Sequence, residues 1–560
     1  MQPWFERYPD RFETDRKELE AIGFSLDKER LEKDKTVEYR GRLPEFPERE
    51  LILSFPSGYP SQPPKCRDDD SQPLLKRHHR ALNRDFCIFG REASRWNVGE
   101  SPVRAIEEVE DVLKRYSDSS NLPDAEEDPV PEPVSNNLPY KDDFFVLIPP
   151  PVSQLISEGL EDPDDGYIKI KKGKNRITKD LSIDRAIVAE ISLKKYDDIL
   201  ECDNLFKNNI LNWIKPPKNE KGKLYYLPVK VESPVTFDLL KELAQNFGFK
   251  VHPSSWYGFI IKEESGHRLN EQHSLMLFHQ PEKSAPYPVR TMQLKNNSTN
   301  IRIPGLEWLD KKKVAVIGCG AIGSRIAVDL ASTGLSNFVL IDPDSIEPDN
   351  AVRHQAGPFS FGLPKVIALR KEIHRKNPEA HAISLPVRFG DIHPHSIEEK
   401  LLEAIQSCDL IVNATGNDHT SRYINEVCCD LDMPGVHVSV TNGAWSGEAV
   451  RFIPGVTPCW MCWDYQNQDR SPAGEPVTSE GIYARGCDQP TFTGTIYDIG
   501  GFSSAATSFS VDALRIADGK NPQFNDHYLL WKNFNNQGQP VMQAELRPIE
   551  FRTPCSFCNS

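Results

Sequence analysis

The sequence predicts a multidomain α/β protein, and three observations support this fold class. The chain has 560 residues, enough for about three domains that each bury a hydrophobic core. An acidic, proline-rich stretch at residues 117–139 separates an N-terminal region from the rest of the chain. From residue 301 onward, apolar strand-like runs alternate with helix-like runs, which is typical of a parallel sheet covered by helices.

The composition excludes several classes of protein. A formal net charge of −15 argues against nucleic-acid binding, because such proteins carry a basic patch. No stretch approaches about 18 consecutive apolar residues, so no membrane-spanning helix is expected. The N-terminus lacks the apolar segment of a signal peptide. The 12 cysteines indicate metal and thiol chemistry in a reducing compartment, and we therefore expect a cytoplasmic protein.

Residues 1–116 predict a small α+β domain. The predicted elements are a helix at residues 11–22, strands at residues 36–43 and 50–55, and a closing amphipathic helix at residues 103–113. The segment FPSGYPSQPPK, residues 55–65, contains four prolines. Because proline fixes φ and removes a backbone donor, this segment should form rigid turns and neither a helix nor a central strand.

This region resembles the ubiquitin-conjugating enzyme fold. That family has the pattern FPxxYPxxPPK, then a His/Asn element, a catalytic cysteine and a tryptophan. Here residues 55–65 match every defined position, and Trp96 follows Cys87 by nine residues. The resemblance implies that Cys87 accepts a thioester, and a buried structural thiol is the alternative. The His-Pro-Asn element of the family is replaced, so His79 and Asn83 are the candidates for the group that supports Cys87.

Residues 117–139 predict an unfolded linker. The stretch begins SDSSNLPDAEEDPVPEPVSNN and nearly lacks large apolar side chains, so it cannot bury enough surface to fold. In polyproline geometry of roughly 3 Å per residue, about 20 residues span about 60 Å. Such reach matters if an activated group has to pass between two distant cysteines.

Residues 140–300 predict an α/β domain without a catalytic motif. Strand-like runs lie at residues 144–148, 167–170, 186–191, 225–231, 256–261 and 275–278, and a helical run lies at residues 237–247. The lysine-rich run KIKKGKNRITK, residues 169–179, leaves two interpretations open. A solvated hairpin is favoured over a phosphate-binding site.

Residues 311–365 predict a nucleotide-binding βαβ unit. An apolar strand leads into the turn GCGAIG, which contains Gly318, Gly320 and Gly323. The first two glycines permit a tight turn, and the third lets the following helix pack closely on the strand. The N-terminus of that helix offers free N–H groups and a positive dipole end to phosphate. A second apolar strand ends at Asp342, where a carboxylate can accept hydrogen bonds from ribose hydroxyls.

The polar residues after this acid favour ATP over a dinucleotide. They are Asp344, Glu347, Asn350, Arg353, His354 and Lys365. Backbone alone can hold a pyrophosphate, whereas a triphosphate that is attacked at one phosphorus needs cations to neutralise charge in the transition state. An NAD-dependent dehydrogenase would leave these cations and the paired cysteines near the C-terminus unexplained.

Residues 301–560 resemble the adenylation domain of ThiF/MoeB-type and ubiquitin-activating enzymes, whose pattern is GxGxxG, DxD, NxxR and a downstream lysine. The resemblance implies a Rossmann-like fold, ATP with magnesium, catalytic roles for Arg353 and Lys365, and a homodimer. In this family an aspartate that helps to hold magnesium follows a later strand. Here Gly416 stands at that position and Asp418 comes two residues later. Either Asp418 takes over this role or the metal is held otherwise.

Two CxxC pairs predict a structural zinc site. They are Cys459 with Cys462 and Cys555 with Cys558. Four thiolates complete a tetrahedral zinc and leave no open position, and the site would tie the C-terminal tail to the domain body. A redox-active CxxC is the alternative for either pair alone. ThiF/MoeB proteins have a zinc site of this arrangement.

Cys487 lies outside these pairs, in a glycine- and proline-rich stretch close to Arg485. A thiol in a mobile loop beside a cation can be exposed and partly ionised, as a nucleophile must be. By resemblance to activating enzymes, Cys487 is the cysteine that forms a thioester. A non-reactive loop cysteine is the alternative.

The two resemblances together match the fused activating and conjugating proteins of bacterial CBASS antiviral operons. In such proteins residues 140–300 would be a spacer or a degenerate adenylation-like domain. The implied reaction adenylates the C-terminal carboxylate of a protein, passes the acyl group to Cys487 and then to Cys87, and joins it to a lysine amine. The expected cargo is a CD-NTase C-terminus, with a dedicated ubiquitin-like protein as the rival. A separate deconjugating protease is a further partner implied by the resemblance.

Two other functions stay open. The first is a sulfur-carrier or small-molecule adenylyltransferase whose N-terminal domain is a docking module. The second is a nucleotide-dependent binding protein without a thioester step. A thioester on Cys87 would separate the conjugating enzyme from the adenylyltransferase, and pyrophosphate exchange would separate both enzymes from the binding protein.

Overall fold

The computed structural model describes most of the chain, which divides into two compact units, Met1–Ser298 and Thr299–Ser560. The described residues are 2–69, 79–80, 85–86, 88, 96–116, 138, 140, 144–159, 162–176, 182–194, 196–201, 218–231, 235–264, 271–282, 284–293, 305–377, 379–391, 394–467, 494–535, 537–552, 555 and 557–558. Asn83, Cys87, Cys487 and residues 117–137, most of the predicted linker, lie outside them. Within the described part, no helix is long and apolar enough to cross a membrane.

The first unit begins with a six-stranded antiparallel sheet in the order β1-β2-β3-β4-β6-β5. Its strands are β1 (Ser25–Leu26), β2 (Val37–Leu43), β3 (Phe46–Phe55), β4 (Lys65–Asp68), β5 (His79–Arg80) and β6 (Asp85–Phe86). The helices of this region are α1 (Trp4–Arg7), α2 (Pro9–Ala21), α3 (Lys28–Asp34) and α4 (Val103–Tyr116). The helices and strands predicted for residues 1–116 are therefore present, with boundaries shifted by a few residues.

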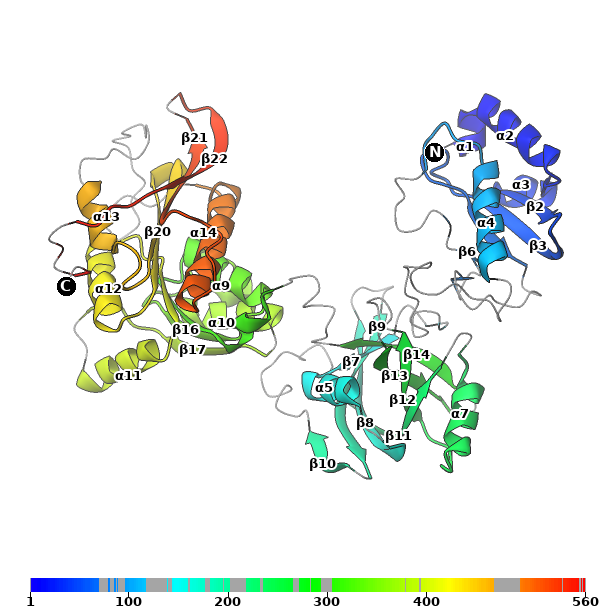
Figure 1. Cartoon of the computed structure of the whole chain (residues 1–560), viewed down its shortest axis with the longest axis horizontal. Coiled ribbons are helices and arrows are strands. Elements are labelled where there is room, and N and C mark those ends of the chain that lie inside the picture. Colours follow the sequence, from blue (N-terminus) through cyan, green and yellow to red (C-terminus); the bar gives the residue numbers. More distant parts are fainter. Residues whose placement is uncertain are drawn as a thin grey trace. The chain divides into compact units, whose positions relative to one another are not determined.

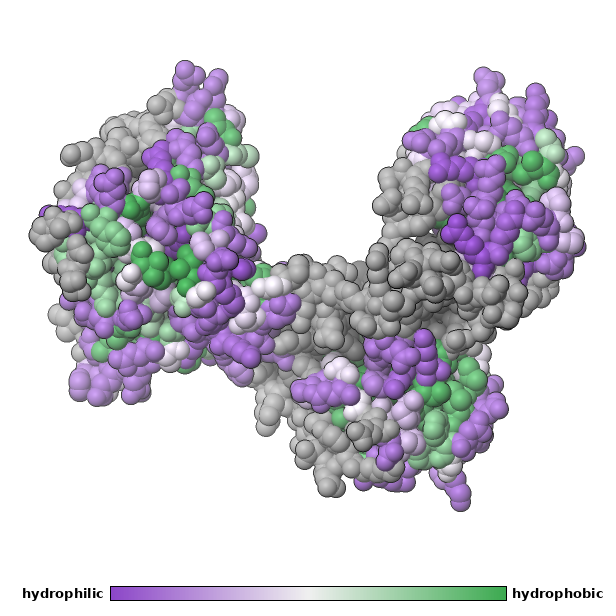
Figure 2. Space-filling model, in the orientation of Figure 1, coloured by the Kyte–Doolittle hydropathy of each residue, from purple (hydrophilic) through white to green (hydrophobic). Residues whose placement is uncertain are grey.

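Helix α4 is amphipathic, as its sequence predicts. Ala105, Ile106, Val109 and Leu113 are buried in the hydrophobic core of this region. Their spacing of three or four residues places them on one face of the helix. The surface over α4 that Figure 2 draws is hydrophilic, so the opposite face is turned to solvent.

The proline-rich motif is fixed by a buried polar network. The hydroxyl of Tyr59, which is only 1% exposed, donates to Asp15 Oδ2 at 2.6 Å and accepts from Arg11 Nη2 at 2.8 Å. Trp96 Nε1 donates to the carbonyl oxygen of Pro60 at 2.8 Å. A buried tyrosine hydroxyl is costly unless it is hydrogen-bonded, so this network joins α2 firmly to the motif.

A second sheet in the first unit contains eight strands in the order β10-β9-β7-β14-β13-β12-β11-β8. They are β7 (Phe144–Ile148), β8 (Asp164–Arg176), β9 (Ser182–Leu193), β10 (Tyr196–Glu201), β11 (Lys218–Lys230), β12 (Trp256–Glu264), β13 (Glu271–His279) and β14 (Tyr287–Gln293). Because β9 also pairs with β8, the sheet closes on itself. The described helices here are α5 (Pro150–Glu158) and α7 (Phe237–Asn246).

This closed sheet mixes parallel and antiparallel pairs. It differs from the open, mainly parallel sheet that a degenerate adenylation-like domain would have. Strands β8 and β9 pair antiparallel from Gly166 and Leu193 to Arg176 and Ser182, so the lysine-rich run lies on a hairpin as favoured above.

The second unit is built on one eight-stranded sheet in the order β17-β16-β15-β18-β19-β20-β21-β22. The strands are β15 (Lys313–Ile317), β16 (Asn337–Ile341), β17 (His381–Leu385), β18 (Leu410–Asn413), β19 (Gly435–Val440), β20 (Ser446–Phe452), β21 (Tyr528–Phe534) and β22 (Pro540–Arg547). The pairs from β17 to β19 are parallel, and the pairs from β19 to β22 are antiparallel. The parallel half is the doubly wound arrangement that the sequence predicts.

Helices cover both faces of this sheet (Figure 1). One core contains residues of α9 (Ala321–Ser332), α10 (Lys365–Lys376) and α14 (Ile496–Ala517). The other contains residues of α11 (His395–Gln406), α12 (Asp418–Asp430) and α13 (Trp460–Gln466). Strands covered on both faces are nearly all apolar, and β15, β16 and β18 have this composition.

A buried ion pair joins β20 to α14. Arg451 Nη1 donates to Asp512 Oδ2 at 2.6 Å, and both side chains are 0% exposed. Arg451 Nη2 also donates to the carbonyl oxygens of Phe524 and Asp526 at 3.0 Å, and Asp512 Oδ1 accepts from the backbone N–H of Gln523 at 2.8 Å. Both charged groups of the pair therefore have further hydrogen-bond partners, which offset the cost of burying their charges.

We expect Asp512→Ala to destabilise the second unit by about 3–5 kcal/mol, because it leaves the Arg451 charge buried without its partner. The thermal transition of this unit should fall by roughly 10 °C in calorimetry of the full chain. Asp518→Ala is the control, since that carboxylate makes a partly exposed pair with Lys312 and should cost about 1 kcal/mol or less. Equal shifts in the two variants would contradict this prediction.

Candidate nucleotide site and four-cysteine cluster

The glycine turn connects β15 to α9, and its three glycines have different steric surroundings. Gly318 has φ +87°, the left-handed region that favours glycine. A Cβ at Gly323 would lie 1.9 Å from the carbonyl oxygen of Gly318, so only glycine lets α9 approach the strand. At Gly320 a Cβ would meet nothing within 4 Å, so this position faces open space at the N-terminus of α9.

Asp342 follows β16 and holds the glycine turn. Its Oδ2 accepts from the backbone N–H of Cys319 at 2.7 Å, and its Oδ1 accepts from the backbone N–H of Asp344 at 2.9 Å. Burial raises the pKa of the Asp342 carboxyl above its usual range, although Lys365 acts in the opposite direction. Both carboxylate oxygens thus have protein donors, and the predicted contact with ribose stays a prediction.

Lys365 begins α10 and pairs with an acid of the DxD motif. Its Nζ lies 2.7 Å from Asp344 Oδ2 and 4.0 Å from Asp342 Oδ1. The Asp344 side chain is 58% exposed, whereas that of Lys365 is 13% exposed. An ion pair with so exposed a carboxylate contributes little stability, so Lys365 can exchange it for a phosphate at small cost.

Asn350 and Arg353 lie in and just after the 3-10 helix Pro348–Asn350. The side-chain oxygen of Asn350 accepts from the backbone N–H of Glu347 at 3.0 Å and closes a capping box. Burial lowers the pKa of the Arg353 guanidinium from its usual value, but arginine stays charged at any physiological pH. The short helix therefore presents a fixed positive charge.

His354 follows Arg353 directly and belongs to the polar cluster that the sequence places after Asp342. Its Nε2 lies 2.9 Å from the carbonyl oxygen of Cys319, and its Nδ1 lies 2.9 Å from the backbone N–H of Ala356. Because Nδ1 accepts, Nε2 must carry the proton and donate to the glycine turn. Burial lowers the pKa of His354 to about 4, which keeps the ring neutral.

We expect His354→Gln to retain ATP affinity within about threefold, because the glutamine amide can still donate to the carbonyl of Cys319. The asparagine of His354→Asn can still accept from the N–H of Ala356, but it does not reach the carbonyl of Cys319. This variant should bind ATP about tenfold more weakly, which corresponds to a loss of roughly 1.4 kcal/mol of binding free energy. Titration with a fluorescent ATP analogue measures both. Similar affinities for the two variants would show that the donation to Cys319 is unimportant.

Gly320, Asn350, Arg353, His354 and Lys365 line one cavity of about 340 Å³, whereas Asp342 and Asp344 are not among its lining residues. Its walls consist of Gly320, Ala321, Ile322, Asn350, Arg353, His354, Lys365, Ala414, Thr415, Gly416, Val438, Ser439 and Val440. The structure therefore brings the glycine turn, the NxxR motif and the downstream lysine together at the carboxyl ends of β15, β18 and β19. That edge is where open α/β sheets bind their ligands.

Asp418 does not belong to this wall. It is the exposed first residue of α12, and the side chain of Asn417 caps this helix by accepting from the backbone N–H of Thr420 at 2.9 Å. Gly416 does line the cavity, and its φ of +61° lets the chain turn there. The magnesium role of Asp418 stays a prediction.

A buried polar network behind the cavity was missed from the sequence. Asn413 Oδ1 accepts from Thr415 Oγ1 at 2.8 Å, and its Nδ2 lies 2.8 Å from Ser421 Oγ and 3.0 Å from His437 Nδ1. Burial lowers the pKa of His437 to about 3. The network fixes Thr415 in the wall. The available signal was an asparagine at the end of an otherwise apolar strand.

The two CxxC pairs come together as predicted. The Sγ atoms of Cys459, Cys462, Cys555 and Cys558 all lie within 4.8 Å of one another. Three of the separations are 3.9 Å, 3.7 Å and 3.5 Å. A Zn–S bond of about 2.3 Å in a tetrahedron separates sulfurs by about 3.8 Å, so the donor set fits zinc in number, type and spacing.

Both predicted thioester cysteines, Cys87 and Cys487, lie outside the described residues. Strand β6 ends at Phe86, directly before Cys87, and His79 lies in β5, which pairs with β6. Among the cysteines that are described, Cys319 is buried inside the glycine turn, and burial raises the pKa of its thiol well above the usual value. This rules out Cys319 as a ready nucleophile.

Known proteins resemble the second unit of this chain. Residues 294–552 match the sequence model of the ThiF family. The uncharacterized protein y4oA of Sinorhizobium fredii is 24% identical over 549 residues, covering 89% of this chain and 88% of that protein. Adenylyltransferase and sulfurtransferase MOCS3 of Xenopus laevis is 25% identical over 265 residues, covering 47% and 51% of the two chains. Ubiquitin-like modifier-activating enzyme 5 of Mus musculus is 30% identical over 154 residues, covering 27% and 38%.

These matches support a ThiF/MoeB-type adenylation domain in the second unit, and with it an enzyme of the adenylyltransferase class. ATP use is expected for such domains. The chain spans about half of the length of MOCS3 and less of the modifier-activating enzyme.

Proposed function

We propose that this protein uses ATP to activate the C-terminal carboxylate of a protein or peptide as an acyl-adenylate. The observation that carries the proposal is the cavity at the glycine turn, where Arg353 and Lys365 lie opposite the N-terminus of α9 within the ThiF-matching residues. Backbone N–H groups and two cations suit a triphosphate. The acyl oxygen would attack the α-phosphorus, and pyrophosphate would leave.

The polar groups in the cavity wall and at the glycine turn would have distinct parts in this reaction. Arg353 and Lys365 would neutralise the charge that builds up on the phosphates in the transition state. Asp342 and His354 would hold the glycine turn from two sides, through the N–H and the carbonyl of Cys319. Lys365 would leave Asp344 for the phosphates when ATP enters.

Magnesium would enter with ATP and screen its phosphates. Asp344 and Asp418 are the carboxylates offered for it. Asp344 is the more exposed partner of its ion pair, and Asp418 lies two residues from Gly416 in the cavity wall. Carboxylate oxygens are the ligands that magnesium prefers.

The proposal extends to a thioester relay. The acyl group would pass from the adenylate to Cys487, then to Cys87, and finally to a lysine amine of a target protein. The motif around residues 55–65, the position of Cys87 before Trp96, and the likeness to a modifier-activating enzyme support this extension. The expected cargo is a CD-NTase C-terminus in a CBASS-type defence system, with a dedicated ubiquitin-like protein as the rival. A homodimer and a separate deconjugating protease complete the proposed system.

We also propose that the four-cysteine cluster holds a structural zinc. Its four sulfurs leave no open position, so the metal would take no part in the chemistry. It would join α13 to the C-terminal tail.

The test is co-expression of wild type, Cys87→Ala and Cys487→Ala with candidate cargo proteins encoded nearby. Non-reducing gels report adducts that reductant removes. The relay predicts an adduct that both substitutions abolish, or one trapped on Cys487 when Cys87 is absent. Pyrophosphate exchange with no adduct in the wild type would reject the relay and leave adenylation standing.

A sulfur-carrier adenylyltransferase is the second candidate, favoured by the likeness to a protein named adenylyltransferase and sulfurtransferase. In that case residues 1–116 would be a docking module. Formation of a thiocarboxylate on the cargo, detected by its mass, would decide for it.

A further inference from the structure

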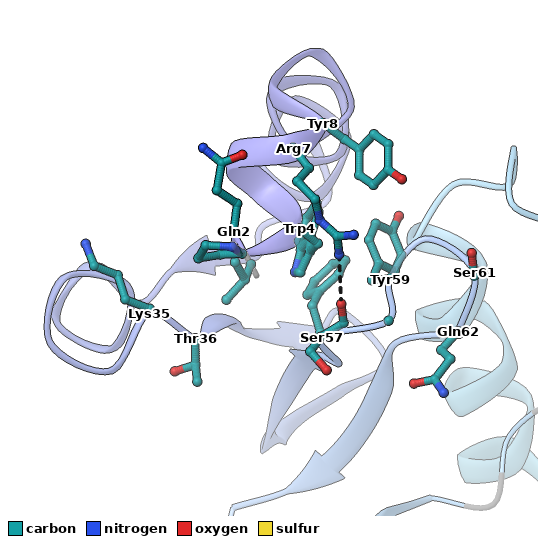
Figure 3. Close-up of a pocket in the computed structure, with 14 residues that line it drawn as sticks. Gln2, Trp4, Arg7, Tyr8, Lys35, Thr36, Ser57, Tyr59, Ser61 and Gln62 are labelled. Atoms are coloured by element: carbon teal, nitrogen blue, oxygen red, sulfur yellow. Dashed lines mark hydrogen bonds between the residues drawn. The ribbon is translucent and has the colours of Figure 1, made fainter.

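The N-terminal region contains a cavity that the proposed chemistry does not use. It measures about 650 Å³ and lies between α1, the start of β2 and the turn of the proline-rich motif (Figure 3). Cavities of this size are typical of ligand sites. Its lining residues include neither Cys87 nor any residue of the nucleotide cavity, so its ligand has to be inferred independently of the proposed reaction.

The floor of this cavity is rigid and aromatic. The ring of Trp4 stacks on Phe55 at 5.4 Å and meets Tyr59 edge-on at 4.6 Å between centroids. All three side chains are buried, so the floor cannot collapse into the space above it. Tyr8 is different, because it is 46% exposed at the rim and offers one ring face to a ligand.

Among the described residues, the walls carry positive charge and no acidic side chain. The cations are Arg7 on α1 and Lys35 in the turn before β2. No carboxylate of the described residues forms an ion pair with either cation. Arg7 Nη2 makes a long bond of 3.4 Å to the carbonyl oxygen of Ser57, and its guanidinium lies 5.6 Å from the centroid of the Tyr8 ring. Seven other cations of this region are in ion pairs with carboxylates: Arg11, Arg16, Arg30, Arg40, Arg49, Arg104 and Lys114.

The two cations are spread along the cavity. In Figure 3, Gln2 and Trp4 lie between Lys35 and Arg7, and Ser61 and Gln62 continue the wall beyond Tyr59. A ligand with carboxylates spaced along an extended chain would meet both, while the hydroxyl and amide groups of the wall bind its backbone.

We propose that this cavity binds an acidic peptide segment of a partner protein. Carboxylates of the segment pair with Arg7 and Lys35, and an apolar or aromatic side chain packs against Tyr8. The complementary charge draws an acidic segment to this one site, although the chain as a whole has a net charge of −15.

The test measures binding of a fluorescein-labelled peptide of alternating glutamate and leucine to the full-length protein by anisotropy. We expect the double variant Arg7→Glu/Lys35→Glu to bind at least tenfold more weakly, and affinity in the wild type to fall as salt rises. The conservative variant Arg7→Lys/Lys35→Arg should stay within about threefold of the wild type.

Lys17→Glu/Arg115→Glu is the matched control, since it makes the same charge change at two exposed residues of the same region that do not line the cavity. Equal losses in the two double variants would show a general charge effect and overturn the proposal. So would no binding by the wild type, or tighter binding of a single-stranded oligonucleotide to the same residues. The measurement needs neither ATP nor cargo, so it can fail while the adenylation proposal holds.

Discussion

Lys365→Ala is expected to lower pyrophosphate exchange at least about 100-fold with any cargo that supports exchange in the wild type. Lys365 and Arg353 are the lysine and the arginine among the lining residues of the cavity. Removing one preorganised group that stabilises transition-state charge typically costs about 10²–10³ in rate. The Lys365 charge stabilises bound ATP less than it stabilises the transition state, so ATP affinity should fall less than tenfold. This split between rate and binding is the expected signature.

Lys371→Ala is the control, because it changes an exposed lysine on the same helix, α10, that does not line the cavity. The structure also predicts little effect of Lys365→Ala on stability, since its partner Asp344 is exposed. Exchange within threefold of the wild type would remove Lys365 from the proposed chemistry. A large fall in the unfolding temperature would instead give Lys365 a structural role.

Cys555→Ser should release one zinc per chain and lower the thermal transition of the second unit by 10 °C or more. Structural zinc sites contribute about 10–16 kcal/mol of apparent binding free energy in small peptides, and much of this stabilises the fold. Cys555 Sγ lies 3.7 Å from Cys459 Sγ, so the substitution removes a ligand that links the C-terminal tail to α13. Metal analysis by mass spectrometry and calorimetry measure the two effects.

Cys408→Ser is the matched control. Its thiol contacts the carbonyl oxygen of Ala404 at 3.3 Å and lies outside the cluster, so zinc content should not change. Treating the wild type with a chelator should lower its thermal transition as Cys555→Ser does. The same treatment should lower the transition of Cys408→Ser by the same amount as that of the wild type. A wild-type protein purified with no zinc, or a Cys555→Ser protein of unchanged stability, would contradict the structural-zinc proposal.

Local pattern was enough for most of the elements. The glycine turn, the strand that ends at Asp342 and the amphipathic helix near residue 103 are present where the sequence predicts them. Each depends on neighbours within one turn or one strand, such as the positive φ at Gly318 or apolar spacing of three and four. Each CxxC pair could be recognised for a similar reason, because its two cysteines lie three positions apart, and two such pairs supply the four ligands of a tetrahedral zinc.

The arrangement of the second sheet lay beyond the sequence. Six of its eight strands were predicted one by one, and β10 and β14 were not. Whether the sheet opens or closes depends on the pairing of β8 with β9 and β11. These pairs join residues up to about 60 positions apart, and local propensity carries no information on them.

The sequence by itself determined the chemistry available to this protein: glycines for a phosphate turn, cations for a triphosphate and thiolates for a metal. Only the tertiary structure decided which of these groups meet. It placed Arg353, Lys365 and Gly320 in one cavity wall. It brought His354 within hydrogen-bond distance of the Cys319 carbonyl in the glycine turn, and it placed Asp418 outside the wall, on the first turn of α12. It also placed Arg7 and Lys35 around one cavity, where no acidic side chain of the described residues pairs with them. Motifs fix residue types through local geometry, whereas a site forms where distant strands end together at one edge of a sheet.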